Sequence, residues 1–289
     1  MKIRVAAGVA LGVVLVAPQA ASAAAAPELS GAAVYASLTA NQLSRYQSGA
    51  WSTLAKTGDM PQYAAAPDGR KAAWVTSSGR LQVRAGGKTY TIVSGVQSGT
   101  PCLTPAWSAD STRVAYAQGS TIMSVKADGT GAPRKLGTSE GVCHLAWSAD
   151  GRYVAGYAGT ADALYRLDVK SGKAVRAKGV KWITHLQSLS PNGRSAIVQF
   201  PANPDTLGDG SWPTSFTPVV LDMVTGKTHA PKVKGKLIGA FYLADGRMVV
   251  RVSGTTHNTL VVLDGAGKEV QRVAEPARAK KQALLQVLP

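Results

Sequence analysis

A short turn sequence returns five times along this chain at a nearly constant interval. Successive copies lie 42, 40, 42 and 53 residues apart. Asp-Gly and Asn-Gly pairs supply the positive φ angles that tight β-hairpins require. A unit that recurs with this period predicts a repeat architecture. The copies are APDGR at Asp68, SADST at Asp110, SADGR at Asp150, SPNGR at Asn192 and LADGR at Asp245.

Apolar segments of strand length flank these turns. Trp107 and Trp147 stand three residues before two of them, and stretches such as RVAYA and YVAGY follow. No ten-residue stretch after the N-terminal segment has good helical periodicity. Each unit therefore reads as four strands, which is the pattern of a β-propeller blade. A second turn series alternates with the first, at Ser48-Gly49, Gly86-Gly87, Asp128-Gly129, Ser171-Gly172, Thr225-Gly226 and Gly265-Ala266-Gly267.

The two ends of the chain predict how the repeats close. The second turn series has six members and the first only five, because the first unit starts at Ala32 without an inner strand. The C-terminal segment 283–288 has no partner of its own, and pairing it with the first unit would remove exposed strand edges. We therefore expect an all-β fold, a six-bladed β-propeller of four-stranded antiparallel blades whose C-terminal strand joins the N-terminal blade. Two stacked sheets are the alternative, and the period fits them poorly.

The first residues have the pattern of a secretory signal peptide. Lys2 precedes an apolar run over 5–16, and small residues up to Ala23 offer a cleavage site. The run is too short for a membrane anchor, and no Cys follows it to carry a lipid. A retained N-terminal anchor is the alternative. We expect a secreted chain without a transmembrane segment after processing, organised as a signal peptide over 1–23, a linker over 24–31 and a single domain over 32–289.

The net charge indicates which kinds of partner the chain attracts. Once Lys2 and Arg4 are removed, 30 basic residues remain against 16 acidic ones, a net charge of +14. Such a chain is attracted to anionic surfaces, including cell-envelope polymers. The alternative is a solvated cationic surface that only aids solubility, because Lys and Arg are scattered. The densest basic cluster, at Arg278, Lys280 and Lys281, has no interleaved aromatic residues, which argues against nucleic-acid binding.

The third and fourth units resemble a known group of repeats. AWSADGRYVAGY, and PAWSADSTRVAYA with the later IMSVKADGTGAPRKL, are similar to the WD40-like (PD40) repeats of the TolB β-propeller family. The resemblance implies a propeller domain and no particular activity. The chain has no room for the α/β domain that TolB also carries, so the translocation role of that family is not implied. Because the Gly-His and Trp-Asp pairs of WD40 repeats are missing, Trp107 and Trp147 are interpreted as packing residues of inner strands.

The two cysteines are one repeat apart. Cys102 and Cys143 each stand just before an inner strand, which places them near each other at the mouth of the central channel. In an exported protein such a pair predicts a disulfide, worth about 3–4 kcal/mol if unstrained. Two buried thiols are the alternative. A metal site is disfavoured because only His144 stands close and no Cys-x-x-Cys is present.

Motifs of catalysis are weak. The stretch GTSEG over 137–141 matches G-x-S-x-G, but it lies in a loop between two units without a strand-to-helix elbow. The histidines have no metal-binding spacing. We expect no catalytic residue, metal ligand or cofactor. The candidate residues for the channel mouth are His144, Trp182, His185 and His257.

The fifth unit is about 11 residues longer than the others, and the excess lies in the loop over 201–215. In a propeller this loop shares a face with the loops between blades, and long loops on a rigid scaffold often carry function. The candidate binding residues are Asp205, Asp209 and Trp212. Trp212 is interpreted either as an exposed aromatic anchor or as a ring tucked into the blade.

These observations favour a non-catalytic function. We expect a monomeric scaffold that binds a protein or an anionic cell-envelope polymer through its loop face. The alternative is a propeller enzyme of the lactonase or glycan hydrolase or lyase type, which would need acidic or His side chains converging at the channel mouth. An apolar, aromatic mouth would favour recognition of a protein or glycan, whereas a ring of carboxylates and imidazoles would favour catalysis.

Overall fold

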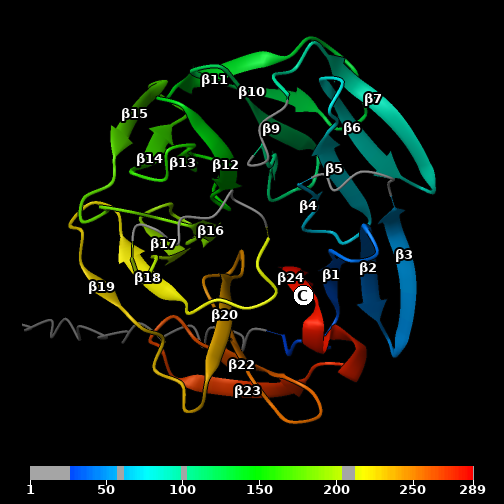
Figure 1. The fold of residues 1–289 in the computed structure, drawn as a ribbon, viewed down its shortest axis with the longest axis vertical. Coiled ribbons are helices and arrows are strands. Elements are labelled where there is room, and N and C mark those ends of the chain that lie inside the picture. The colour runs from blue at the N-terminus through cyan, green and yellow to red at the C-terminus, as the bar shows by residue number, and fades with distance from the viewer. Residues whose placement is uncertain (1–26, 57–61, 99–102, 204–211, 289) are drawn as a thin grey trace, which may run out of the picture.

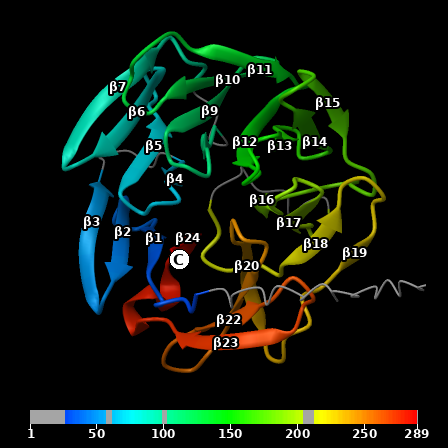
Figure 2. The same ribbon diagram turned by 180° about the vertical axis from the view of Figure 1, so that it is seen from behind.

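Strands wind around a central axis in the computed structural model, which describes residues 27–56, 62–98, 103–203 and 212–288 (Figure 1). The short inner strands lie near the axis, and strands such as β3, β7 and β23 lie at the rim, in both views (Figures 1 and 2). Within the described residues, no helix is long and apolar enough to cross a membrane. The predicted signal peptide over 1–23 lies outside the described residues.

Four sheets have four strands each, and in each the neighbouring strands pair antiparallel. The N-terminal sheet has the order β24 (Ala283–Val287), β1 (Ala33–Ser37), β2 (Gln42–Gln47), β3 (Ala50–Lys56). The next has β4 (Ala64–Ala65), β5 (Lys71–Val75), β6 (Arg80–Ala85), β7 (Lys88–Ser94). The last two have β16 (His185–Leu189), β17 (Ser195–Gln199), β18 (Val219–Asp222), β19 (Thr228–His229), and β20 (Leu237–Tyr242), β21 (Met248–Val252), β22 (Thr259–Leu263), β23 (Glu269–Ala274).

A fifth sheet has eight strands, where the sequence predicts two separate blades. Its two four-stranded halves are antiparallel within themselves. Their outer strands meet in the parallel pairing of Thr138 with Lys173, and Thr104, just before the inner strand of the first half, forms a parallel bridge with His144. The outer strands can approach because Gly137 has no side chain; a Cβ there would stand 2.5 Å from the carbonyl oxygen of Gly172. The halves are β8 (Ala106–Trp107), β9 (Arg113–Gln118), β10 (Thr121–Lys126), β11 (Arg134–Thr138), and β12 (Val142–Trp147), β13 (Tyr153–Ala158), β14 (Leu164–Asp168), β15 (Lys173–Arg176).

The all-β, propeller-like arrangement of antiparallel four-stranded sheets is therefore confirmed, whereas six separate sheets are not seen. The described residues form five sheets, because β11 and β15 touch at the rim. Sequence periodicity marks the inner hairpins and carries no signal for a contact between two outer strands.

The C-terminal strand completes the N-terminal sheet, as the sequence predicts. Strand β24 pairs antiparallel with β1, and the Leu288 backbone N–H donates to the carbonyl oxygen of Ala32. A 3-10 turn over Ala277–Lys281 delivers the chain from the last sheet into β24. The first and last parts of the chain thus share one sheet, and separating them would expose the edges of β1 and β24.

The residues of each recurring turn motif form the hydrogen bonds that hold the turn. In SADGR the Gly151 N–H donates to the carbonyl oxygen of Ser148, and the Asp150 carboxylate accepts from the Ser148 hydroxyl and the Arg152 N–H. Gly151 has φ +74°, a conformation that glycine adopts without strain. Each turn therefore uses its own aspartate, or Asn192 in SPNGR, to hold the chain reversal in place.

The segment before the first strand is tied to the last sheet. Leu29 is 4% exposed, and its N–H and C=O both bond the Gln271 side-chain amide at 2.8 Å. The Pro27 carbonyl oxygen accepts from Arg247 at 2.7 Å. Residues 27–31, which the sequence analysis assigns to a linker, thus pack against β23 and the turn before β21.

Candidate binding site

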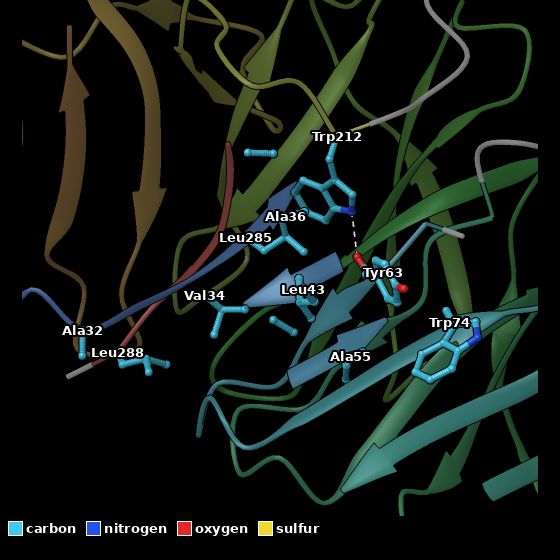
Figure 3. Packing of buried hydrophobic residues seen from close by; sticks show 13 residues of the cluster. Ala32, Val34, Ala36, Leu43, Ala55, Tyr63, Trp74, Trp212, Leu285 and Leu288 are labelled. Atoms are coloured by element: carbon cyan, nitrogen blue, oxygen red, sulfur yellow. Dashed lines mark hydrogen bonds between the residues drawn. The ribbon is translucent and has the colours of Figure 1, made fainter. Parts of the chain in front are cut away.

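Trp212 closes one end of the central channel. It is 8% exposed and packs in one cluster with Ala65, Tyr63 and Leu285, which come from two inner strands and the segment before one of them. Its indole Nε1–H donates to the Tyr63 carbonyl oxygen at 2.7 Å (Figure 3). Of the two interpretations left open by the sequence, the tucked ring is the one observed, although it is tucked into the channel and bridges several sheets.

Two buried histidines flank this indole. The ring centroids of His144 and His185 lie 5.0 and 5.3 Å from that of Trp212 and 5.4 Å from each other. Tyr157 stacks on His144 and Phe216 packs edge-on against His185. We call this group of five side chains the aromatic end of the channel. Edge-to-face packing of this kind fixes ring positions and excludes solvent.

His185 is held as a neutral link between two sheets. Burial lowers its pKa to about 4, and the hydrogen bond to Gln187 offsets only part of that effect. The His185 Nε2 lies 2.9 Å from the Gln187 Oε1, while the Gln187 Nε2–H donates to the Leu284 carbonyl oxygen on β24. Because the Gln187 amide donates in that direction, its oxygen accepts, and Nε2 of His185 carries the hydrogen.

A buried arginine holds the loop that delivers Trp212. Arg251 on β21 is 1% exposed and donates to the carbonyl oxygen of Thr214 at 3.0 Å, two residues after Trp212. Its Nε donates to the Glu275 carboxylate at 2.8 Å, and its terminal nitrogens also reach the carbonyl oxygens of Ala279 and Gln282. The guanidinium therefore joins the long loop to the segment that enters β24.

The other candidates from the sequence are not part of this group of five side chains. Trp182 is half-buried, and His257 is exposed with its Nδ1 3.0 Å from the Thr256 hydroxyl. Cys143 is 4% exposed and packs against Leu103 and Ala117. Within the described residues, no three His, Cys, Asp or Glu side chains form a group that could hold a metal. Asp205, Asp209 and Cys102 lie outside the described residues.

A cavity of about 490 Å³ occupies the other end of the channel. It is bounded by inner strands and by the turns that follow them, and Trp212 and Gln187 form its inner wall. We call it the channel cavity. Its aromatic lining comes from Trp107, Trp147, Trp212, Phe241 and Tyr242, and its turn residues are Pro67, Asp68, Ala109, Asp110, Ser111, Ala149, Ala244 and Asp245.

Polar side chains in the wall of the channel cavity are hydrogen-bonded within the protein. Trp107 and Trp147 donate their indole N–H groups to the carbonyl oxygens of Ala64 and Gly151. Gln187 uses both ends of its amide, and the Ser188 hydroxyl accepts from the Tyr242 N–H. The wall therefore offers an occupant mainly apolar and aromatic surface.

The three carboxylates of the wall form hydrogen bonds within their own turns. Asp68 accepts from the Arg70 N–H and pairs with Lys71 at 2.8 Å. The hydroxyl of Ser108 lowers the pKa of Asp110, with a further contribution from Thr112. Burial alone would raise the pKa of Asp245, but its bonds to Arg247 bring the pKa below its usual range. All three carboxylates thus form bonds within their own turns, and the lowered pKa values of Asp110 and Asp245 favour their ionised form.

The channel cavity lies on the face opposite to the one that the sequence analysis favours. The prediction followed the length of the loop over 201–215, which places Trp212 inside the channel. The signal for the cavity was nevertheless present, since the repeated WSAD stretches supply Trp107, Asp110 and Trp147 to its wall. Periodicity located the inner strands but not which end of the channel stays empty.

No protein-family model matches the sequence, and no curated protein is significantly similar to it. Among solved structures, TolB from Acinetobacter baumannii is similar with 16% identity and a TM-score of 0.53, over 88% of this chain and 66% of that one. The fold is a β-propeller.

A second solved structure agrees. A chain of the nidogen/laminin complex is similar with 11% identity and a TM-score of 0.53, over 88% of this chain and 96% of that one. At these identities the likeness concerns the fold alone. The propeller described here spans about two thirds of the length of TolB, so the activity of the whole TolB protein is not carried over.

Proposed function

We propose that this propeller is a secreted, non-catalytic scaffold that binds a partner protein by accepting an apolar side chain in the channel cavity. The proposal includes a signal peptide over 1–23, a linker over 24–31, and one TolB-like, WD40-like domain over 32–289. It also includes six blades, because each half of the eight-stranded sheet repeats the four-strand order of the other sheets.

The observation that carries the proposal is the chemistry of the cavity wall. A sugar would leave hydroxyl groups unpaired against polar side chains that are already bonded, and unpaired buried groups cost about 1–3 kcal/mol each. An apolar side chain has no such cost and gains about 1.5–3 kcal/mol when fully buried. Aromatic anchors in pockets of this kind are typical centres of protein interfaces. The wall thus favours a polypeptide segment over a glycan.

Selection from a displayed random-peptide library tests this function. The mature protein should enrich peptides that carry one Trp, Phe or Leu at a common position. Ala149→Phe places a ring in the turn at the cavity wall and should abolish the enrichment. Val175→Phe is the matched control, because it adds the same ring at an exposed site on β15. Equal enrichment by both variants would contradict binding in the cavity.

The non-catalytic part of the proposal has its own test. The alternative function, a propeller enzyme with its site at the channel mouth, predicts turnover of lactones, glycans or peptides by the purified mature protein. If such a site lay at the channel cavity on the opposite face instead, the turn carboxylates of Asp68, Asp110 and Asp245 would be its acids. Turnover that is lost in Asp110→Asn, with folding retained, would replace the binding proposal by catalysis.

We also propose the disulfide between Cys102 and Cys143. Leu103, the neighbour of Cys102 in sequence, packs against Cys143, so the chain passes close enough for a link. Thiol titration of the denatured, unreduced protein should find no free thiol. Two free thiols would reject the bond.

A further inference from the structure

Two arginines converge on one serine in the third repeat. Arg113 on β9 donates its Nε–H and Nη2–H to the Ser124 hydroxyl oxygen at 3.3 and 3.1 Å. Arg134 on β11 donates its Nε–H to the same oxygen at 3.4 Å. The Arg113 Nη2–H also reaches the Ser124 carbonyl oxygen at 3.3 Å, so three guanidinium nitrogens share the hydroxyl and carbonyl oxygens of one serine. We call Arg113 and Arg134 the arginine pair.

Strand register explains why the three side chains share one face. Ser124 on β10 lies opposite Ala115 on one side and Arg134 on the other. Arg113 stands two residues before Ala115, and alternate residues of a strand point to the same face. Ser124 is fully buried, while Arg113 is half-buried and Arg134 is exposed. The serine thus sits beneath the two guanidinium groups.

Among the described residues, neither arginine forms an ion pair. Burial and the nearby Arg134 lower the pKa of Arg113, and Asp110 opposes that effect only in part. The Asp110 carboxylate already accepts hydrogen bonds from Ser108 and Thr112. Two like charges are therefore held together with N–H donors that point to no described acceptor, an arrangement that an added anion would stabilise.

Arg113 stands just after a turn in the wall of the channel cavity, and Arg134 lies on the outer strand β11 of the same sheet. Asp110 and Ser111 belong to its wall, and Arg113 follows directly in the same hairpin, closed by its N–H bond to the Ser108 hydroxyl. The face that carries the pair also carries Ala115 and Leu136, in the hydrophobic cluster against which Trp147 of the cavity wall packs. A chain that leaves the cavity between β8–β11 and β12–β15 would meet the pair.

We propose that the arginine pair binds a carboxylate of the same protein segment whose apolar side chain occupies the channel cavity. This inference rests on the proposed function and deepens it, because it defines the partner as an apolar or aromatic anchor followed or preceded by an Asp or Glu. Guanidinium groups suit carboxylates through paired N–H donors. A polypeptide is favoured over an anionic polymer because the adjoining wall is apolar and aromatic.

Peptide selection followed by a double-mutant cycle tests the pair. Wild-type protein should enrich peptides with an anchor and an acidic residue at a fixed spacing, and Arg134→Gln should keep the anchor and lose the acidic preference. In fluorescence polarisation with a selected peptide, Arg134→Gln should weaken binding about fivefold. The Glu→Gln form of the peptide should bind the wild-type protein and Arg134→Gln equally, because the peptide change and the protein change each remove the same contact between carboxylate and guanidinium.

Arg84→Gln is the matched control. Arg84 on β6 is half-buried and bonded to the Thr89 hydroxyl at 3.1 Å, so the variant removes the same charge from another sheet. It should keep the acidic preference. Circular dichroism of each variant shows whether the fold is retained.

The outcomes separate the two proposals. An anchor without an acidic preference, or a preference that survives Arg134→Gln, rejects the arginine pair and leaves the cavity proposal standing. No anchor at all rejects the cavity proposal and the pair with it. Binding of sodium polyphosphate that is lost in Arg134→Gln, without any selected anchor, rejects the carboxylate in favour of an anionic polymer.

Discussion

The two ends of the central channel have similar side chains, but one end is filled by the protein and the other holds a cavity. At the aromatic end, Trp212 fills the space between the inner strands and is bonded to the Tyr63 carbonyl oxygen. At the other end, Trp107 and Trp147 line a cavity of about 490 Å³. Both ends have aromatic rings. They differ because the Trp212 indole occupies the space at the aromatic end, whereas at the other end it only forms the inner wall of the cavity.

This difference indicates where a partner can bind. A channel filled by the protein's own tryptophan gains packing energy and offers no space to a ligand. A cavity with the same kind of wall has aromatic surface that remains to be covered. Trp212 thus contributes to stability, whereas the short recurring turns line the candidate site.

The largest expected effect comes from the arginine that anchors the aromatic end. Arg251→Met should lower the free energy of unfolding by about 4 kcal/mol, because it leaves the buried Glu275 carboxylate without its guanidinium. Urea denaturation measures the loss. Arg251→Met combined with Glu275→Gln should recover part of it. Arg272→Met, which breaks the exposed pair with Glu269, should cost less than about 1 kcal/mol, and an equal cost would contradict the special role of the buried pair.

Removal of the indole itself should have the next largest effect. Trp212→Ala empties the aromatic end and leaves the Tyr63 carbonyl oxygen without its donor, so unfolding should become about 3–4 kcal/mol easier. Thermal and chemical denaturation both report this change. A cost below about 1 kcal/mol would mean that Trp212 does not seal the channel in solution.

Acid should weaken the aromatic end through His185. Its pKa is lowered to about 4 by burial, whereas an unfolded histidine titrates near about 6.5. Between these values the unfolded chain binds a proton that the folded chain does not. Stability should therefore be constant above about pH 6.5 and fall by about 3 kcal/mol as the pH drops to about 4.

Denaturation curves across this pH range check the effect. His185→Gln should flatten the dependence by about one proton. His229→Gln is the control, because His229 is exposed on β19. A slope that His185→Gln leaves unchanged would show that other groups are responsible.

The smallest expected effect is at the cavity end. Trp147 is half-buried, and its indole donates only to its own turn, so Trp147→Ala should cost about 1 kcal/mol. The same denaturation experiment gives the comparison with Trp212→Ala. Similar costs for the two tryptophans would remove the distinction between the two ends.

Part of the fold could be predicted from particular residues of the sequence, and part could not. The recurring Asp-Gly and Asn-Gly turns predicted the inner hairpins, because they are local patterns with a fixed period. The closing strand was predicted from the missing inner strand of the first unit and the unpaired segment 283–288. The joining of β11 to β15 was not predictable, since it depends on how closely two outer strands approach. The pairing of Arg251 with Glu275 was also missed, because these residues stand 24 positions apart in a segment without a motif.

The features of the candidate site also fall into those that the sequence determined and those that only the tertiary structure decided. The sequence alone determined the strand period, the turn chemistry and the aromatic residues of the inner strands, because each depends on neighbours along the chain. Only the tertiary structure decided that Trp212 enters the channel, that the opposite end stays empty, and that Arg113 and Arg134 meet over Ser124. These contacts join residues from different strands and loops. Their positions follow from how the strands pair and pack, and no local pattern encodes that.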